Sequence, residues 1–96
     1  MNRPEPTLGN PKNTIEILQK YKFVFQKKFG QNFLIDEHVL EKIISAAGIG
    51  PDDFVVEIGP GIGTMTQYLA HAARGVAAVE IDKALIPILQ DTLSAY

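Results

Sequence analysis

A short apolar run that ends in three closely spaced glycines constrains the fold of this chain more than any other feature. Residues 54–58 are Phe-Val-Val-Glu-Ile, and Gly59, Gly61 and Gly63 follow at every second position. The β-branched run is typical of a strand, and the glycines let the backbone turn sharply and let a ligand approach without meeting a Cβ atom. A helical pattern follows at residues 62–73. The segment therefore predicts a strand, a tight loop and a helix.

A second apolar run at residues 76–81 extends this pattern. Glu80 lies near its end, 21 positions after Gly59. A carboxylate about 20 residues beyond the first glycine is where a β-α-β unit meets the hydroxyl groups of a ribose. Strands joined by such a crossover are expected to be parallel. The two runs together predict a site for a cofactor that contains adenosine.

The remaining segments predict three further helices. Residues 13–14 are expected to cap a short helix, and Asp36 and Gly48 are expected to bound a second one. Residues 83–96 have a helical pattern with Asp82 as its cap. The predicted order is α-α-β-α-β-α, an α/β fold. Because parallel sheets normally contain several strands, we expect the N-terminal part of a larger doubly wound, Rossmann-like domain, truncated before its third strand.

The distribution of charge divides the chain near residue 35. Residues 1–35 carry six basic and two acidic side chains, whereas residues 36–96 carry three basic and nine acidic ones. Proline and glycine are frequent in residues 1–12, which predicts a flexible leader. We therefore expect residues 1–35 to be a leader and basic arm, and residues 36–96 to begin the cofactor-binding domain. The basic arm favours a nucleic-acid partner, although a short polar leader is also lysine-rich by chance in many chains.

Composition excludes several classes of site. The chain has no cysteine, which rules out disulfides and thiolate metal sites. His38 and His71 have no ligand-forming neighbours in the pattern, so we expect no metal. No apolar run approaches the length of about 18 residues that a membrane span requires, and the start is polar rather than signal-like. We expect a cytoplasmic protein without a membrane partner.

The glycine spacing separates two classes of cofactor. A dinucleotide fingerprint needs its third glycine at position 64, which is Thr64, and Gly63 comes one residue early. The order G-x-G-x-G after Glu57 is similar to the loop of class I S-adenosylmethionine-dependent methyltransferases. A carboxylate beside the loop favours a cationic ligand and opposes a phosphate. The alternatives are a backbone-capping role for Glu57, a solvated strand end at Glu80, and a nicotinamide-dependent oxidoreductase.

A second motif narrows the class further. Residues 27–34 are Lys-Lys-Phe-Gly-Gln-Asn-Phe-Leu, and with residues 57–63 and 79–82 they resemble the ribosomal RNA adenine dimethyltransferase family. The resemblance covers residues 20–96. It is nearest to the branch that dimethylates two adjacent adenines in small-subunit (16S) RNA. The large-subunit branch, which confers macrolide resistance, is similar but usually has serine in place of Gly30 and G-T-G-x-G in the loop.

The resemblance implies roles for matching residues only. The cofactor would be S-adenosyl-L-methionine, with the contacting residues Asn32, Leu34, Gly59, Gly61 and Glu80. Lys27 and Lys28 would meet phosphates of small-subunit ribosomal RNA in the pre-30S particle. Family members also carry an acidic residue that binds the adenine ring and an N-L-P-Y-like catalytic segment, and neither occurs in these 96 residues. No catalytic residue is therefore predicted, and an RNA- or ribosome-binding module without catalysis is the alternative.

Overall fold

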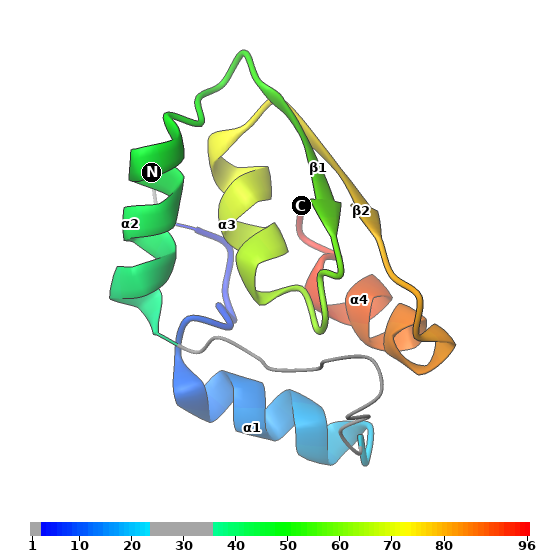
Figure 1. The fold of residues 1–96 in the computed structure, drawn as a ribbon. Helices are drawn as coiled ribbons and strands as arrows, with labels where there is room; N and C mark the ends of the chain where they lie inside the picture. The colour runs from blue at the N-terminus through cyan, green and yellow to red at the C-terminus, as the bar shows by residue number, and fades with distance from the viewer. Residues whose placement is uncertain (1–2, 24–35) are drawn as a thin grey trace.

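The computed structural model describes residues 3–23 and 36–96, which form helices and one parallel sheet. The elements, in chain order, are α1 (Pro11–Lys20), α2 (Glu37–Ala47), β1 (Phe54–Ile58), α3 (Thr64–Ala72), β2 (Gly75–Val79), the 3-10 turn η2 (Lys83–Leu85) and α4 (Ile86–Thr92). The α/β class and the order α-α-β-α-β-α agree with the prediction from sequence (Figure 1).

The two strands pair in parallel along their whole length. Phe54 pairs with Gly75 at one end, and Ile58 pairs with Val79 at the other. Helices α2 and α3 lie side by side on one side of the strands (Figure 1). Val55 and Glu57 are half buried on that side, in alternation with exposed neighbours. Because the strands are parallel, their carboxyl ends lie together at the glycine loop. Ligands bind at this end of the strands in open parallel sheets.

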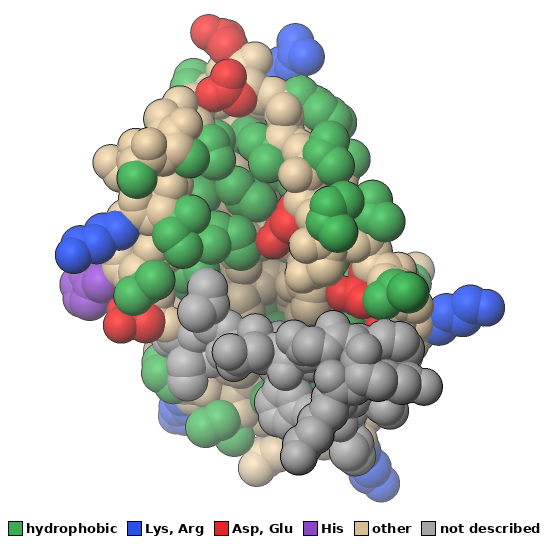
Figure 2. Space-filling model, viewed as in Figure 1, with side chains coloured by type: hydrophobic (Ala, Val, Ile, Leu, Met, Phe, Trp, Pro, Cys, Tyr) green, Lys and Arg blue, Asp and Glu red, His purple; other side chains and the backbone are tan. Residues whose placement is uncertain are grey.

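The opposite face of the sheet is apolar and uncovered. Val56 and Ile58 on β1 are 61% and 76% exposed, and Val79 on β2 is 56% exposed. Figure 2 shows hydrophobic side chains along the strands in the same view. Sheets in α/β proteins normally have both faces covered. In the described part of the chain, this face therefore departs from that arrangement.

The first helix begins earlier than expected. Asn10 is its N-cap, and its side chain accepts a hydrogen bond from the Lys12 N–H at 3.0 Å. Pro11 occupies the first turn, where its fixed φ and missing N–H are tolerated. The prediction that residues 13–14 cap this helix is therefore wrong, because the proline was assigned to a leader rather than to a helix start.

The caps of the later helices agree with the prediction. Asp36 accepts a hydrogen bond from an N–H of the first turn of α2, and Gly48 ends that helix with a φ of 67°. Asp82 accepts one from the Ala84 N–H at 3.0 Å. The last helical segment is shorter than predicted, since η2 precedes α4 and α4 ends at Thr92. Within residues 3–23 and 36–96, no helix is long and apolar enough to cross a membrane.

Residues 3–10, here called the N-terminal segment, pack against the body of the protein. Leu8 is only 1% exposed and belongs to a core cluster with Ile62, Leu85 and Ile88. The Thr14 hydroxyl donates a hydrogen bond to the Leu8 carbonyl at 3.0 Å. A flexible leader does not describe these residues. Burial of one leucine side chain stabilises such a contact by about 1.5–3 kcal/mol, which local sequence composition does not reveal.

Helix α1 is also joined to α4 by polar contacts at its end. Lys20 Nζ and the Tyr21 hydroxyl both donate to Asp91 Oδ2, each at 2.6 Å. The hydrogen bond from Lys20, followed by that from Tyr21, lowers the pKa of the Asp91 carboxyl. Because Lys20 is largely exposed, the ion pair adds little stability.

Gly63→Ala should destabilise the fold more than Gly48→Ala. Both glycines have positive φ, 94° and 67°, so both substitutions introduce strain. Only at Gly63 would the added Cβ lie 2.8 Å from Thr92 Oγ1, whereas nothing lies within 4 Å at Gly48. We expect urea unfolding to show a loss that is larger by about 1–3 kcal/mol for Gly63→Ala. Equal losses would contradict the close packing of the loop on α4.

Candidate functional site

The loop after β1 has one packed side and one open side. Gly59, Gly61 and Gly63 have φ values of 72°, 63° and 94°, which side-chain-bearing residues rarely adopt. The Gly59 N–H donates to the Val79 carbonyl at 2.8 Å, which joins the loop to the end of β2. A Cβ at Gly59 would meet nothing within 4 Å. The backbone at Gly59 is thus accessible to a ligand, while Gly63 is packed against α4.

Glu80 lies directly beside this loop. Its Oε1 accepts a hydrogen bond from the Gly61 N–H at 3.0 Å, and its Oε2 accepts one from the Asp82 N–H at 2.9 Å. A carboxylate has about four acceptor positions, so two remain for further donors. The side chain is only half buried. The structure therefore brings together Gly59, Gly61 and Glu80, three of the residues that the sequence selected.

Glu57 lies on the α3 side of β1, close to the start of that helix. The Thr66 hydroxyl donates a hydrogen bond to Glu57 Oε1, and Thr66 is almost fully buried. Burial raises the pKa of the Glu57 carboxyl, and the hydrogen bond from Thr66 partly opposes this. This contact is with a side chain, whereas the capping interpretation expected a backbone group. Glu57 is thus a partly desolvated carboxylate beneath the loop, an arrangement common at functional sites.

The loop also depends on residues that the sequence analysis did not select. The side chain of Ile62 is fully buried, and the Thr92 hydroxyl donates to the Ile62 carbonyl at 2.8 Å. Gln67, on α3, is 1% exposed and bonds to both ends of the described chain. The residue type gives no signal for this role, because glutamine is more often a surface residue.

The other predicted site residues lie outside the described residues: Lys27, Lys28, Asn32 and Leu34. Their roles stay predictions. Within the described ranges, no group of three or more histidine or acidic side chains is arranged to hold a metal ion.

Comparison with known proteins finds similar sequences in one family. A sequence model for the family described as "Ribosomal RNA adenine dimethylase" matches residues 22–96. A protein of Lachnoclostridium phytofermentans named "Ribosomal RNA small subunit methyltransferase A" is 74% identical over 90 residues, which cover 93% of this chain and 31% of that protein.

Relatives from other bacteria give the same result. Proteins with that name from Alkaliphilus oremlandii and Geobacillus thermodenitrificans are 54% and 56% identical over 89 residues, with 93% of this chain covered. The chain spans 31% and 30% of the length of these two relatives.

The stability of Glu57→Gln relative to the wild type should rise between pH 4 and pH 7. Because burial raises the pKa of Glu57 above its ordinary 4.5, the folded chain binds this proton more tightly than the unfolded chain. The contribution to stability is present below the unfolded pKa and is lost as pH rises through the folded pKa. Glutamine keeps an acceptor for Thr66 and carries no charge, so it avoids that loss.

Urea unfolding at both pH values measures this difference. The matched control is Glu16→Gln, on an exposed position of α1. A difference between Glu57→Gln and the wild type that stays constant, or falls, from pH 4 to pH 7 would contradict the desolvation of the Glu57 carboxylate.

Proposed function

This chain belongs to the ribosomal RNA adenine dimethylase family, and on that premise we propose that it forms the cofactor-loop part of a small-subunit ribosomal RNA methyltransferase. The enzyme would use S-adenosylmethionine to dimethylate N6 of two adjacent adenines in 16S RNA, in the cytoplasm, on a pre-30S particle. The observation that carries the proposal is the family match over residues 22–96, which includes the glycine loop and Glu80. The relatives' names favour the small-subunit branch over the large-subunit one.

We propose a Rossmann-like arrangement for the complete domain. The support comes from the parallel β1–α3–β2 unit, the glycine loop at its carboxyl end and the acidic residue after β2. The uncovered apolar face of the sheet also favours further strands and helices in longer relatives. Residues 36–96 would then be the first part of this domain, and the basic arm would precede it within residues 1–35.

The residues at the loop fit S-adenosylmethionine. The open space at Gly59 allows close approach of the ligand to the backbone. Glu80 retains acceptor positions for the two ribose hydroxyls beside its bonds to the loop. Glu57, when ionised, favours the sulfonium and ammonium groups and disfavours the phosphates of a dinucleotide. When bound, the cofactor supplies an electrophilic methyl group.

The roles of this chain's residues are to bind and to orient. We propose that Asn32 and Leu34 line the cofactor cleft, and that Lys27 and Lys28 contact RNA phosphates, where each would contribute salt-dependent affinity. The target adenine must leave its stack to reach the methyl group. The N-L-P-Y-like segment that would accept the amine hydrogens is absent from the 96 residues, so this chain would contribute no catalytic side chain.

S-adenosylmethionine should bind this chain in preference to a nicotinamide dinucleotide, and Glu80→Gln should weaken that binding. Glutamine offers one acceptor oxygen where the carboxylate offers two, so it cannot serve the Gly61 N–H, the Asp82 N–H and the ribose together. We expect calorimetric titration to show a loss of about 10-fold to 100-fold, the usual cost of one hydrogen bond to a charged group. Glu16→Gln is the control. Tighter binding of the dinucleotide would reject the assignment.

A chimera tests the full function. Residues 1–96 of this chain would replace the matching part of the Lachnoclostridium phytofermentans relative, with which 74% of 90 residues are identical. Incubated with labelled S-adenosylmethionine and unmodified small subunits, the chimera should methylate two adjacent adenines, whereas the 96-residue chain alone should transfer nothing. Methyl transfer by the chain alone would contradict the missing catalytic segment. A folded, cofactor-binding chimera without activity would favour the RNA-binding alternative.

A further inference from the structure

We infer that the N-terminal segment, residues 3–10, is a positioning element of the cofactor loop, and that Leu8 and Gln67 transmit this effect. The inference rests on the proposed function only for the identity of the ligand. The family model begins at residue 22, so the N-terminal segment lies outside the part of the chain that the family pattern defines. In the structure it is nevertheless in contact with the loop.

The first contact is apolar. Leu8 packs in one cluster with Ile62, the residue between Gly61 and Gly63, and their side chains are 1% and 0% exposed. Leu85 and Ile88 close the same cluster from the side of η2 and α4. Leu8 therefore fills the space under the middle of the loop, and its loss would leave a cavity against Ile62.

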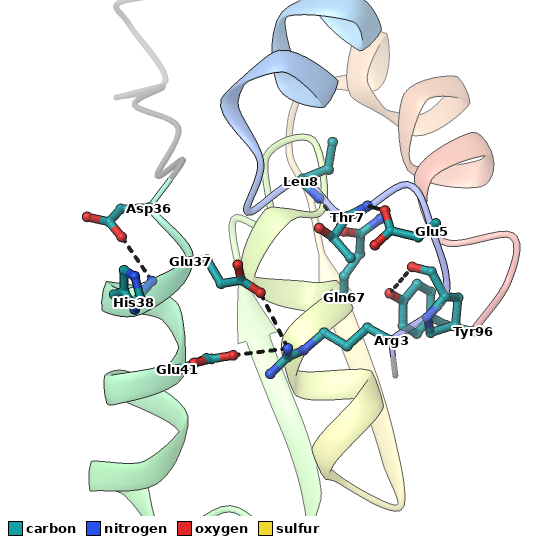
Figure 3. A network of polar contacts seen from close by, with 11 residues as sticks. Arg3, Glu5, Thr7, Leu8, Asp36, Glu37, His38, Glu41, Gln67 and Tyr96 are labelled. Atoms are coloured by element: carbon teal, nitrogen blue, oxygen red, sulfur yellow. Dashed lines mark hydrogen bonds and ion pairs between the residues drawn. The ribbon is translucent and has the colours of Figure 1, made fainter. Parts of the chain in front are cut away.

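The second contact is a set of buried hydrogen bonds made by Gln67. Its Oε1 accepts from the Leu8 N–H at 2.8 Å, and its Nε2 donates to the Thr92 carbonyl at 2.8 Å and to the Pro6 carbonyl at 3.3 Å. The Gln67 N–H donates to the Gly63 carbonyl at 3.0 Å. The side chain of Gln67 thus connects the N-terminal segment to the end of α4. Figure 3 shows Gln67 next to Thr7 and Leu8 of the segment.

The start of the N-terminal segment is fixed independently. Arg3 forms ion pairs with Glu37 at 3.6 Å and Glu41 at 3.1 Å on α2 (Figure 3). Its guanidinium also lies 4.2 Å from the centre of the Tyr68 ring. The Tyr96 hydroxyl donates to the Pro4 carbonyl at 3.3 Å. The segment is therefore attached to the body before Leu8 as well as at Leu8 itself.

The loop needs such external support. Glycines lose more backbone entropy on ordering than other residues, so a loop with three left-handed glycines has little intrinsic preference for one conformation. Contacts to Ile62 from Leu8 and Thr92 select that conformation before the ligand arrives. A pre-ordered loop binds more tightly because less entropy is lost on binding. The N-terminal segment thereby raises affinity without touching the ligand.

Hydrogen exchange of the backbone amides tests the inference directly. Leu8→Ala and Gln67→Leu should accelerate exchange at residues 61–64 by about tenfold or more, because local opening of the loop becomes easier. Exchange in α2 should stay unchanged. The affinity for S-adenosylmethionine, measured where circular dichroism shows a folded chain, should fall about fivefold to twentyfold. Ile15→Ala, an exposed apolar position on α1, is the matched control and should change neither quantity.

Each outcome decides the question. Exchange that rises uniformly along the chain, or loop exchange and affinity that do not change, would overturn the inference. Should Leu8→Ala fail to fold, Leu8→Val removes less volume and keeps the same comparison available. If the wild-type chain binds no S-adenosylmethionine and the loop still exchanges faster in the variants, the proposed cofactor fails while the positioning role stands.

Discussion

The burial of Ile62 under a loop of glycines is the constraint on which the rest of the site depends. The loop must turn tightly to place Ile62 in the core, and the turn brings the Gly61 N–H to Glu80 and the Gly59 backbone to the surface. Gly59 has no Cβ and leaves space for a ligand, whereas the absence of a Cβ at Gly63 allows the loop to contact Thr92. The same repeat of glycines therefore leaves one end of the loop open and packs the other end against α4.

The two carboxylates at the site have opposite energetic roles in the protein alone. Glu80 accepts two backbone N–H groups and thereby orders the loop. Glu57 is partly desolvated, and burial raises its pKa, so its ionised form costs folding stability at neutral pH. A loss of folding stability of this kind is expected where the ionised carboxylate has a function. A cationic cofactor beside the loop would recover part of it on binding, which links the stability of the site to its occupation.

The features that the sequence predicted correctly are those that depend on residues close together in the chain. The β-branched run before Gly59, the spacing to Glu80 and the caps at Asp36 and Asp82 are short-range signals, and the structure agrees with the elements they predict. The sequence did not reveal the packing of Leu8 or the role of Gln67. The hydrogen bond from the Leu8 N–H to Gln67 Oε1 joins residues 59 positions apart, and neither residue type indicates such a contact. The early start of α1 was missed because Pro11 suits both a leader and a helix start.

The position of the core indicates how the described structure is organised. Its buried apolar cluster, Leu8 with Ile62, Leu85 and Ile88, lies beneath the loop at the carboxyl ends of the strands rather than across the sheet. The sheet itself keeps one apolar face uncovered. Among the described residues, Leu8, Glu80 and Thr92 contact the loop, and none of the three lies in a strand of the sheet. These contacts to the glycine loop are thus distinct from the contacts that would cover the exposed face of the sheet.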